Sequence, residues 1–415
     1  MSIIPHTLQH LDSDGRLLFT TRIARLFAYG FLSVILVFYL LSVGLSEEQS
    51  GLLLTLTLLG DTAVSLWITT SADRIGRKKM LIIGAGLMIF AGVLFALTQN
   101  FYLLLFAATI GVISPSGNEV GPFLSIEQAS LTHIIPNEQR TSLFAWYNLV
   151  GSFATALGAL AGGGLAQVLQ DRGTTALDSY RVIVIGYALI GGSLAWLFTF
   201  LSARIEVPPS PNHQPNKLLG GLHKSRRTVF KLAGLFSIDA FAGGFVIQSI
   251  VAYWFFVRFG LDKAIIGSIF FGANLLAGLS ALSAARIARR IGLINTMVFT
   301  HIPSNILLIL VPLMPTAPLA IIVLLLRFSI SQMDVPTRQS YTMAVVDPDE
   351  RSAASGVTGV ARTTGAAISP AIATPMTANA SLIAGPFFIA GGLKIVYDLL
   401  LYRSFKAAKP PEEVK

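Results

Sequence analysis

Apolar runs of about 20 residues recur along the chain, and they constrain its fold more than any other feature. A helix needs ~20 mostly apolar residues to cross the hydrocarbon of a membrane, and twelve stretches meet that length. The composition agrees, since 53% of the 415 residues are hydrophobic and only 12% are charged. We therefore predict an all-α membrane protein with spans near residues 18–45, 49–71, 80–98, 101–134, 141–168, 180–203, 228–258, 264–285, 293–313, 318–345, 352–376 and 382–403.

Basic residues gather in the loops on one side of these spans. If the N-terminus is cytoplasmic, the cytoplasmic segments hold twenty-two of the 30 Lys and Arg residues. The opposite loops hold only Arg172, Arg181, Arg258 and Lys263. The positive-inside rule then predicts that both termini lie in the cytoplasm, which agrees with an even number of spans in the cell membrane. The net charge of +9 reflects this topology, and we expect no nucleic-acid partner.

A repeat within the sequence relates its two halves. A shift of 216 residues lays ARRIGLINTM (288–297) over ADRIGRKKML (72–81), and shifts of 211 and 214 align two further segments in the same order. This predicts two six-helix halves of the same topology. A Pro-rich polar segment separates them. We predict an N-terminal bundle at 1–203, a cytoplasmic linker at 204–227, and a C-terminal bundle with a cytoplasmic tail at 228–415.

The loop between spans 2 and 3 carries a motif of a known family. Residues 69–78 read TTSADRIGRK, and the chain resembles the major facilitator superfamily of secondary transporters, whose pattern is G-x-x-x-D-R-x-G-R-[RK]. Thr69 replaces the glycine that permits close helix packing in that pattern. The resemblance implies twelve spans in two pseudo-symmetric bundles, a monomer, and a cytoplasmic gate motif consisting of Asp73, Arg74, Gly76, Arg77 and Lys78.

Span 5 contains a cluster of small residues with two interpretations. Gly158, Gly162 and Gly163 resemble the G-P-x-x-G-G element of drug:proton antiporters, with Ala159 in place of the proline. Small residues at this spacing also let two membrane helices pack closely. Both interpretations stay open at this point.

Charged side chains inside the spans occur at matching positions of the repeat. Such a charge costs ~2.5–3.5 kcal/mol on insertion scales, so each should face a cavity or a partner. Arg25 aligns with Asp239, and Glu127 aligns with Arg338. The resemblance implies that span 1 faces span 4 and that span 7 faces span 10. We predict the pairs Arg25–Glu127 and Asp239–Arg338, and the alternative is that they are static salt bridges.

Two further charges lie at equal depth in opposite halves. Asp61 lies twelve residues before Asp73, and Arg362 lies eleven after Arg351. At ~1.5 Å per residue, both are ~17 Å from the cytoplasmic loops. The resemblance implies that span 2 lies beside span 11, which makes Asp61–Arg362 a candidate bridge between the bundles. The alternative is that Asp61 pairs within its own half.

Three more charges lie near the middle of the membrane: Glu119 on span 4, and Arg327 and Asp334 on span 10. Glu119 follows SPSGN (114–118), a break that would free backbone groups to line a site. Burial opposes ionisation of a carboxyl group and a neighbouring arginine favours it, so such an acid can exchange protons. We predict that Glu119, Asp334 and Asp239 couple protons to transport. The alternative for Glu119 is a hydrogen-bonded acid beside a proline kink.

Spans 9 and 12 carry polar residues as well. Lys394 and Asp398 are spaced i, i+4 on span 12, which predicts that they pair with each other. The resemblance implies that spans 9 and 12 are peripheral, so a structural role is expected for His301 and Asn305.

The expected function is secondary transport by alternating access. We favour proton-coupled efflux of a drug or other small organic molecule, because the acids match the bases and the cavity spans are apolar. Uptake of an anionic metabolite, clamped by Arg327 and Arg338, stays open, and a receptor on a transporter fold is the alternative from another class. No enzyme, cofactor or metal is expected, since HExxH, GxSxG and Walker motifs are missing. The partners are the substrate, the proton and membrane lipid.

Overall fold

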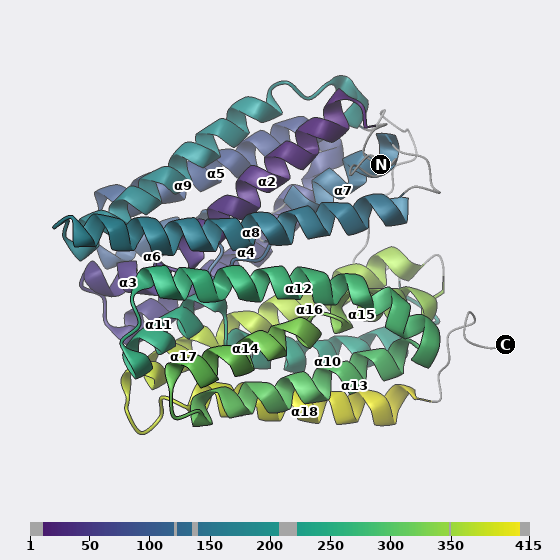
Figure 1. The fold of residues 1–415 in the computed structure, drawn as a ribbon. Helices are drawn as coiled ribbons and strands as arrows, with labels where there is room; N and C mark the ends of the chain where they lie inside the picture. The colour runs from purple at the N-terminus through teal and green to yellow at the C-terminus, as the bar shows by residue number, and fades with distance from the viewer. Residues whose placement is uncertain (1–10, 120–122, 135–139, 207–221, 348–349, 407–415) are drawn as a thin grey trace, which may run out of the picture. The chain divides into compact units, whose positions relative to one another are not determined.

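The computed structural model describes residues 11–119, 123–134, 140–206, 222–347 and 350–406, which form helices without any strand among them (Figure 1). The N-terminal half contains α2 (Ser13–Ser33), α3 (Leu36–Ser42), α4 (Glu47–Ile75), α5 (Arg77–Leu97), α6 (Phe101–Ile110), α7 (Phe123–Ile134), α8 (Arg140–Asp171), α9 (Ala176–Phe198) and the 3-10 helix η2 (Ala203–Ile205). The C-terminal half contains α10 (Arg226–Gly244), α11 (Gln248–Phe259), α12 (Lys263–Ile291), α13 (Leu293–Leu310), η3 (Val311–Leu313), α14 (Ala317–Ser331), α15 (Asp334–Ala344), α16 (Arg351–Ile368), α17 (Pro370–Ala378) and α18 (Gly385–Phe405).

These helices have the lengths and compositions of membrane spans. Within the described residues, nine helices are long and apolar enough to cross a membrane, or ten if the bent pair of α2 and α3 is one span. Each of the twelve predicted spans coincides with one helix or with two consecutive helices. The predicted spans 1, 4, 7, 10 and 11 are the ones made of two helices, with their first helices ending at Ser33, Ile110, Gly244, Ser331 and Ile368. The all-α, twelve-span architecture predicted from the sequence is confirmed.

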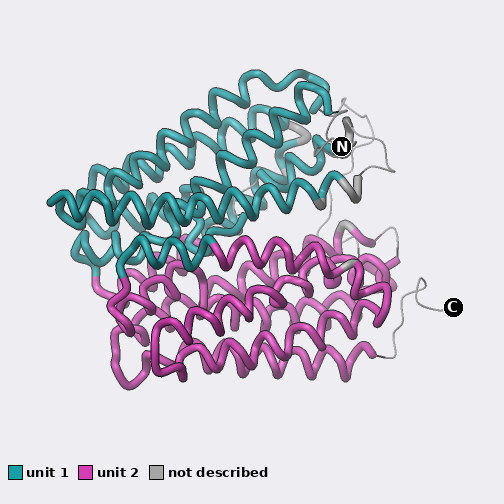
Figure 2. The backbone as a smooth tube through the Cα atoms, viewed as in Figure 1, with its two compact units in different colours: residues 1–45, 59–214, 262–271 teal, residues 46–58, 215–261, 272–415 magenta. Residues whose placement is uncertain are grey.

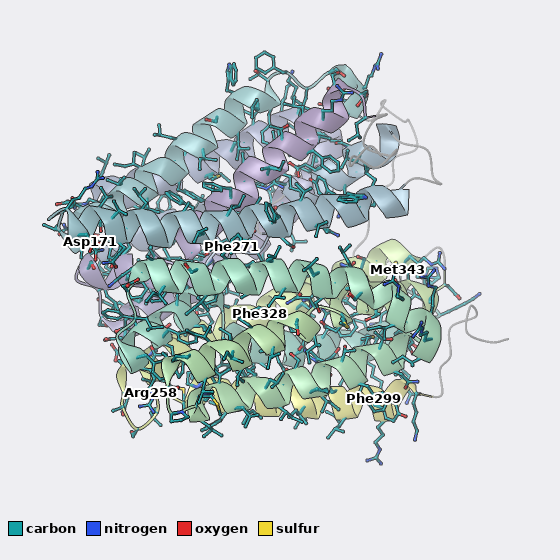
Figure 3. The ribbon with its side chains drawn as sticks, viewed as in Figure 1. Asp171, Arg258, Phe271, Phe299, Phe328 and Met343 are labelled. Atoms are coloured by element: carbon teal, nitrogen blue, oxygen red, sulfur yellow. The ribbon has the colours of Figure 1, made fainter. Side chains whose placement is uncertain are left out.

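Large apolar side chains cover the outer faces of the helices. Leu97, Leu189 and Trp196 are 78%, 68% and 63% exposed. Phe299, on α13, is another exposed aromatic residue (Figure 3). In a soluble protein such apolar surfaces would be exposed to water at a cost in free energy, but in a lipid bilayer they contact acyl chains that are equally apolar.

The chain divides into two compact units (Figure 2). Unit 1 comprises residues 1–45, 59–214 and 262–271, and unit 2 comprises residues 46–58, 215–261 and 272–415. The division between 214 and 215 falls inside the predicted linker at 204–227. The structure also shows that the units do not follow the two halves of the sequence strictly, because α4 and α12 each contribute residues to both units. Residues 207–221 of the linker lie outside the described residues.

Glycines let α2 and α8 approach each other within unit 1. A Cβ atom added at Gly158 would lie 2.0 Å from the carbonyl oxygen of Phe27, and one added at Gly162 would lie 2.2 Å from that of Phe31. From the other helix, a Cβ atom at Gly30 would lie 2.1 Å from the carbonyl oxygen of Thr155. The obstacles are backbone atoms, so the helices themselves would have to separate. The close-packing interpretation of these glycines therefore has a direct structural basis.

This packing predicts a position-specific loss of stability. Gly158→Ala should lower the stability of the purified protein by ~1–3 kcal/mol, the usual range for overpacking, because its new methyl group meets backbone of α2. Gly164→Ala is the matched control on α8, since no atom lies within 4 Å of a Cβ atom placed there. Thermal unfolding in detergent measures the difference. Equal melting temperatures for the two variants would contradict the close approach of the helices.

Candidate functional site

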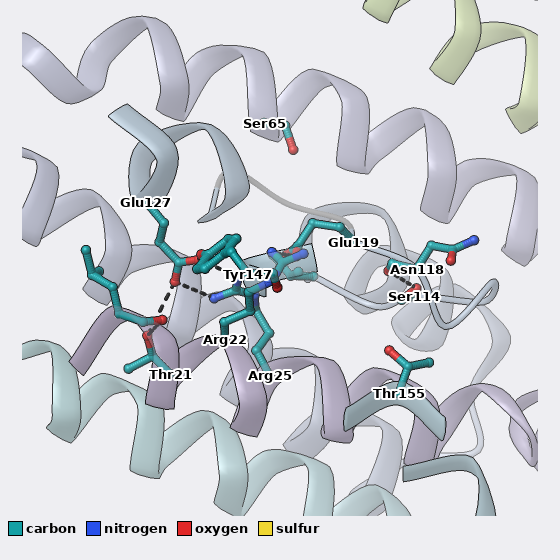
Figure 4. Close-up of polar contacts among 12 residues, drawn as sticks. Thr21, Arg22, Arg25, Ser65, Ser114, Asn118, Glu119, Glu127, Tyr147 and Thr155 are labelled. Carbon is teal, nitrogen blue, oxygen red and sulfur yellow. Dashed lines mark hydrogen bonds and ion pairs between the residues drawn. The ribbon is translucent and has the colours of Figure 1, made fainter. Parts of the chain in front are cut away.

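Unit 1 contains a buried group of two arginines and two glutamates, here called the Arg25 cluster: Arg22, Arg25, Glu119 and Glu127 (Figure 4). Nη1 and Nη2 of Arg25 donate to the two carboxylate oxygens of Glu127 at 2.6 and 2.7 Å. Nε of Arg25 donates to Oε1 of Glu119 at 2.9 Å, and Arg22 donates to Oε2 of Glu119 at 2.6 Å. The structure thus brings together the predicted pair Arg25–Glu127 and adds Arg22 and Glu119 to it.

Tyr147 on α8 binds two members of the Arg25 cluster, Glu127 and Arg22. Its hydroxyl donates to Oε2 of Glu127, and its backbone carbonyl accepts from Nε of Arg22 at 2.8 Å. The guanidinium of Arg22 also lies 4.0 Å from the centre of the tyrosine ring. The cluster contains two acids and two bases, and every carboxylate oxygen in it has a donor. Its charges are therefore balanced without any further ion.

The break in span 4 places Glu119 beside the arginines. Helix α6 ends at Ile110, and residues 111–119 are not helical. Gly117 has a φ of +71°, a conformation that favours glycine. The hydroxyl of Ser114 donates to the carbonyl of Asn118 at 2.7 Å, and the hydroxyl of Thr155 donates to the carbonyl of Gly117 at 3.3 Å. Side chains thus satisfy backbone groups that the missing helix leaves unpaired.

Unit 2 contains a second buried group of charges. Asp239 on α10 accepts from Nη1 of Arg338 at 3.1 Å and from Nζ of Lys394 at 2.6 Å. The same Nη1 donates to Asp334 at 2.9 Å, one turn away on α15. The predicted pair Asp239–Arg338 is thus in contact, and Asp334 and Lys394 join it from α15 and α18.

The prediction that Lys394 pairs with Asp398 is wrong. Lys394 binds the side chain and the backbone carbonyl of Asp239, at 2.6 and 3.3 Å. Asp398 instead faces Nδ1 of His301 at 2.8 Å and accepts from Nδ2 of Asn305 at 3.1 Å. Partners on α10 and α13 therefore displace the i, i+4 contact along α18. We refer to Asp239, Asp334, Arg338, Lys394, His301 and Asp398 together as the Asp239 cluster.

Two arginines of unit 2 have no acidic partner among the described residues. Arg327 on α14 and Arg362 on α16 are half-buried, and the Nε atom of each is buried without a hydrogen-bond partner. The guanidinium of Arg327 lies 4.8 Å from the ring centre of Phe328. In unit 1, Asp61 accepts from the hydroxyl of Ser65 at 3.4 Å. Because Asp61 and Arg362 belong to different units, the bridge Asp61–Arg362 stays a prediction.

The predicted gate motif surrounds the start of α5. Gly76 has a φ of +116° and precedes the first residue of the helix. The carboxylate of Glu206 accepts from the backbone N–H groups of Arg77 and Lys78 at 2.6 and 3.1 Å. The side chain of Lys78 binds the carbonyls of Thr199 and Leu201 at 2.6 and 2.8 Å. Sequence reasoning missed Glu206, which compensates the positive end of the helix dipole.

Asp73 and Arg74, the remaining residues of the motif, belong to the last turn of α4. Their side chains lie outside the described residues. The charge relay that the family resemblance implies for Asp73 and Arg77 therefore stays a prediction. Arg77 donates to Glu206 from its backbone N–H group, and its side chain donates from Nη1 to the carbonyl of Ile205 at 3.1 Å.

In unit 2, Glu350 binds the three residues that directly precede α10, and we call this contact the Glu350 cap. Its buried carboxylate accepts from the backbone N–H groups of His223, Lys224 and Ser225 at 3.1, 2.7 and 3.0 Å. Burial on its own would raise the pKa of Glu350, but these three donors outweigh it and hold that pKa below its ordinary value. Sequence reasoning missed this residue as well.

The Glu350 cap predicts a pH-dependent contribution to stability. Because its pKa is lower in the folded protein, the contribution is complete above the ordinary glutamate pKa of about 4.3 and is lost as the pH falls through the folded value. Glu350→Gln should therefore lower the melting temperature at neutral pH, and the difference from the wild type should shrink in acid. Asp347→Asn, at a partly exposed side chain 3.9 Å from Lys224, is the control. A difference that does not change with pH would contradict the cap.

No group of three or more His, Cys, Asp or Glu side chains that could hold a metal ion occurs within the described part of the chain. Both clusters consist of charged side chains in ion-pair contact, and such side chains can exchange partners and bind protons.

Comparisons with known proteins agree over most of the chain. A model of the Major Facilitator Superfamily matches residues 18–370. The membrane protein YJR124C of Saccharomyces cerevisiae is 30% identical over 417 residues, which cover 94% of this chain and 93% of that protein. The quinolone resistance protein NorA of Staphylococcus aureus is 27% identical over 139 residues, or 34% of each chain. A crystal structure of a D-xylose-proton symporter matches with a TM-score of 0.72 at 16% identity, covering 97% of this chain and 99% of that one.

Proposed function

The chain belongs to the Major Facilitator Superfamily of membrane transporters, and we propose that it exports a small organic molecule in exchange for protons. In this proposal the substrate and the proton bind the two conformations of an alternating-access cycle unequally, since only differential binding can drive the change. We further propose that the transporter works as a monomer in the cell membrane with both termini in the cytoplasm, as the distribution of its basic residues favours.

The observation that carries proton coupling is the unequal charge of the two clusters. The Arg25 cluster has as many acids as bases. The Asp239 cluster has three carboxylates but only two permanent cations in ion-pair contact with them, and the third carboxylate, Asp398, faces the titratable side chain of His301 instead. Of the three predicted coupling acids, Asp239 and Asp334 lie in this cluster. Glu119 has an arginine on each oxygen, and we propose that it positions Arg22 and Arg25.

Efflux is the direction we favour. Arg22 and Arg25 of the Arg25 cluster are both held within ion pairs, so neither of them is free to bind an anionic substrate. NorA, which matches a third of the chain, is named for quinolone resistance, and this likeness supports export of a drug-like molecule. In the proposed cycle, the pair Asp61–Arg362 and the gate motif with Asp73, Arg74, Gly76, Arg77 and Lys78 form and break as the cytoplasmic side closes and opens.

Uptake of an anionic metabolite is a second candidate, and one observation favours it. Arg327 and Arg362 each have a buried Nε atom without a partner among the described residues, and a guanidinium is well suited to a carboxylate or phosphate. Arg338, which the sequence suggested as the second half of the clamp with Arg327, is already bound to Asp239 and Asp334. The clamp would therefore consist of Arg327 and Arg362.

Opposite proton gradients separate the two candidates. Purified protein in proteoliposomes should accumulate a fluorescent quinolone when the lumen is acidic, because protons then leave as the quinolone enters. Accumulation of radiolabelled benzoate with acid outside, lost in Arg327→Gln, would instead favour anion uptake. Protein-free vesicles control for passive distribution of both probes. Proton-independent accumulation of either probe would contradict the proposal, and an absence of flux for both would favour a receptor.

A further inference from the structure

His301 lies within the Asp239 cluster with its two ring nitrogens near two different carboxylates. Nδ1 is 2.8 Å from Oδ1 of Asp398, and Nε2 is 4.0 Å from Oδ1 of Asp239. The imidazole is buried, with 4% of the residue exposed. Histidine is the side chain whose ordinary titration falls within the physiological pH range. His301 therefore belongs to a residue type that exchanges protons near neutral pH, unlike the carboxylates around it.

Asp398 determines which nitrogen of His301 can take up a proton. One of its oxygens faces Nδ1 of His301, and the other accepts from Nδ2 of Asn305 at 3.1 Å. An ionised carboxylate can only accept hydrogen bonds, so Nδ1 carries the hydrogen and donates it. Nε2 is then the nitrogen with a free lone pair, and the nearby carboxylate of Asp239 would stabilise a proton bound there.

The charges around His301 leave room for one additional proton. An imidazolium at this position would lie between two carboxylates, with Asp398 at Nδ1 and Asp239 near Nε2. Nearby opposite charges favour the charged form of a titratable group, so these two carboxylates favour uptake of the proton. The helices packed against α13 carry these ionisable groups: Arg327 on α14; Asp334, Arg338 and Tyr341 on α15; and Lys394, Tyr397, Asp398, Tyr402 and Arg403 on α18. Helix α10, whose Asp239 lies 4.0 Å from Nε2 of His301, also carries Arg226, Arg227 and Lys231, and α13 has no other ionisable group of its own.

Asn305 and Ser304 follow His301 on α13 and are buried. Oδ1 of Asn305 and Oγ of Ser304 have no hydrogen-bond partner among the described residues. Nδ2 of Asn305 donates to Asp398 at 3.1 Å. Asn305 therefore helps to hold the carboxylate that faces Nδ1 of His301.

We propose that His301 takes up and releases the coupling proton at Nε2, with Asp398 and Asn305 as positioning residues. The inference rests on the proposed function, because it assigns the proton of that cycle to one atom. The step is an addition of one proton from water to the imidazole, and its reversal releases the same proton. The imidazolium competes with Arg338 and Lys394 for the carboxylate of Asp239. Proton binding thereby weakens the contact between α10 and α15 and favours one conformation.

Proton binding can be measured without any substrate. Full-length protein labelled with ¹³C-histidine in lipid nanodiscs contains six labelled imidazoles. The signal that is missing from both His301→Gln and His301→Asn, and is thereby assigned to His301, should titrate between about pH 5 and 8 in the wild type. In Asp398→Asn its midpoint should fall by about one pH unit or more, the usual effect of removing a contacting opposite charge. His223→Gln, at an exposed side chain, should leave the signal unchanged. A His301 signal that does not titrate in the wild type, or an unchanged midpoint in Asp398→Asn, would overturn the inference.

A flux measurement separates this inference from the proposed function. His301→Gln should lose quinolone accumulation driven by an acidic lumen but keep quinolone exchange across vesicles without a gradient, which also shows that the variant is folded. Proton-coupled flux that persists in His301→Gln would overturn the role of His301 and leave the proposed function intact. Proton-independent flux in the wild type would overturn both.

Discussion

Replacing Asp239 with alanine is expected to lower stability by ~3–5 kcal/mol, the usual loss when one partner of a buried ion pair is removed, and to abolish proton-coupled flux. Asp239 is 4% exposed and binds both Arg338 and Lys394. Without it, Lys394 has no carboxylate within ion-pair distance among the described residues. Thermal unfolding in detergent and flux in proteoliposomes measure the two effects.

The double variant Asp239→Asn with Lys394→Met is the control for this loss. It removes one charge of each sign, so its stability should exceed that of Asp239→Asn alone, while proton-coupled flux stays absent. This separates the energetic cost of an unpaired lysine from the role of the carboxylate in transport. A double variant no more stable than the single one would show that Lys394 does not depend on Asp239 for its charge balance.

Replacing Arg25 with methionine is expected to have an effect of similar size in unit 1. Arg25 is fully buried and holds both oxygens of Glu127 and one of Glu119. Among the described residues, its removal leaves Glu127 with the hydroxyls of Tyr147 and Thr21 as its remaining side-chain donors. We expect a loss of ~3–5 kcal/mol, because a carboxylate would then be buried without a cation.

A double-mutant cycle tests whether this loss belongs to the pair. Arg25→Met combined with Glu127→Met leaves Arg22 and Glu119 to balance each other at 2.6 Å. The double variant should therefore be more stable than either single variant. Additive losses from the two substitutions would contradict a coupled pair and would locate the stabilisation in separate contacts.

The sequence predicted two intramembrane pairs from the repeat and the family resemblance together. Alignment of the halves matched the charged positions, and the resemblance implied which spans face each other. The closest atoms of the pairs Arg25–Glu127 and Asp239–Arg338 are 2.6 and 3.1 Å apart. The repeat reports which helices correspond, and its charges are swapped between the halves. A pairing can therefore be read without knowing the exact rotation of each helix.

The sequence did not predict contacts that depend on helix rotation. The spacing of Lys394 and Asp398 suggested a pair along α18, but each residue binds a neighbouring helix instead. An i, i+4 spacing shows that two side chains share a face and says nothing of the partners which that face meets. For the same reason His301, expected to be structural on a peripheral span, was not recognised as a neighbour of Asp239.

The helix caps formed by Glu206 and Glu350 could not be predicted either. Each acid lies more than a hundred residues from the helix start that it caps. Only the tertiary fold brings the two together, because a local capping box involves residues three positions apart. The basic segment that begins at Arg204 contains one glutamate, Glu206, but the sequence alone does not indicate which helix start it binds.

The most direct test of the account is the movement of protons by the wild-type protein. A pH-sensitive dye trapped in acid-loaded proteoliposomes reports the lumenal pH when a quinolone is added outside. The account predicts that the lumen becomes more alkaline as the quinolone accumulates, and that Asp239→Asn shows neither change. Accumulation of the quinolone by the wild type with no change in lumenal pH, relative to protein-free vesicles, would contradict proton exchange.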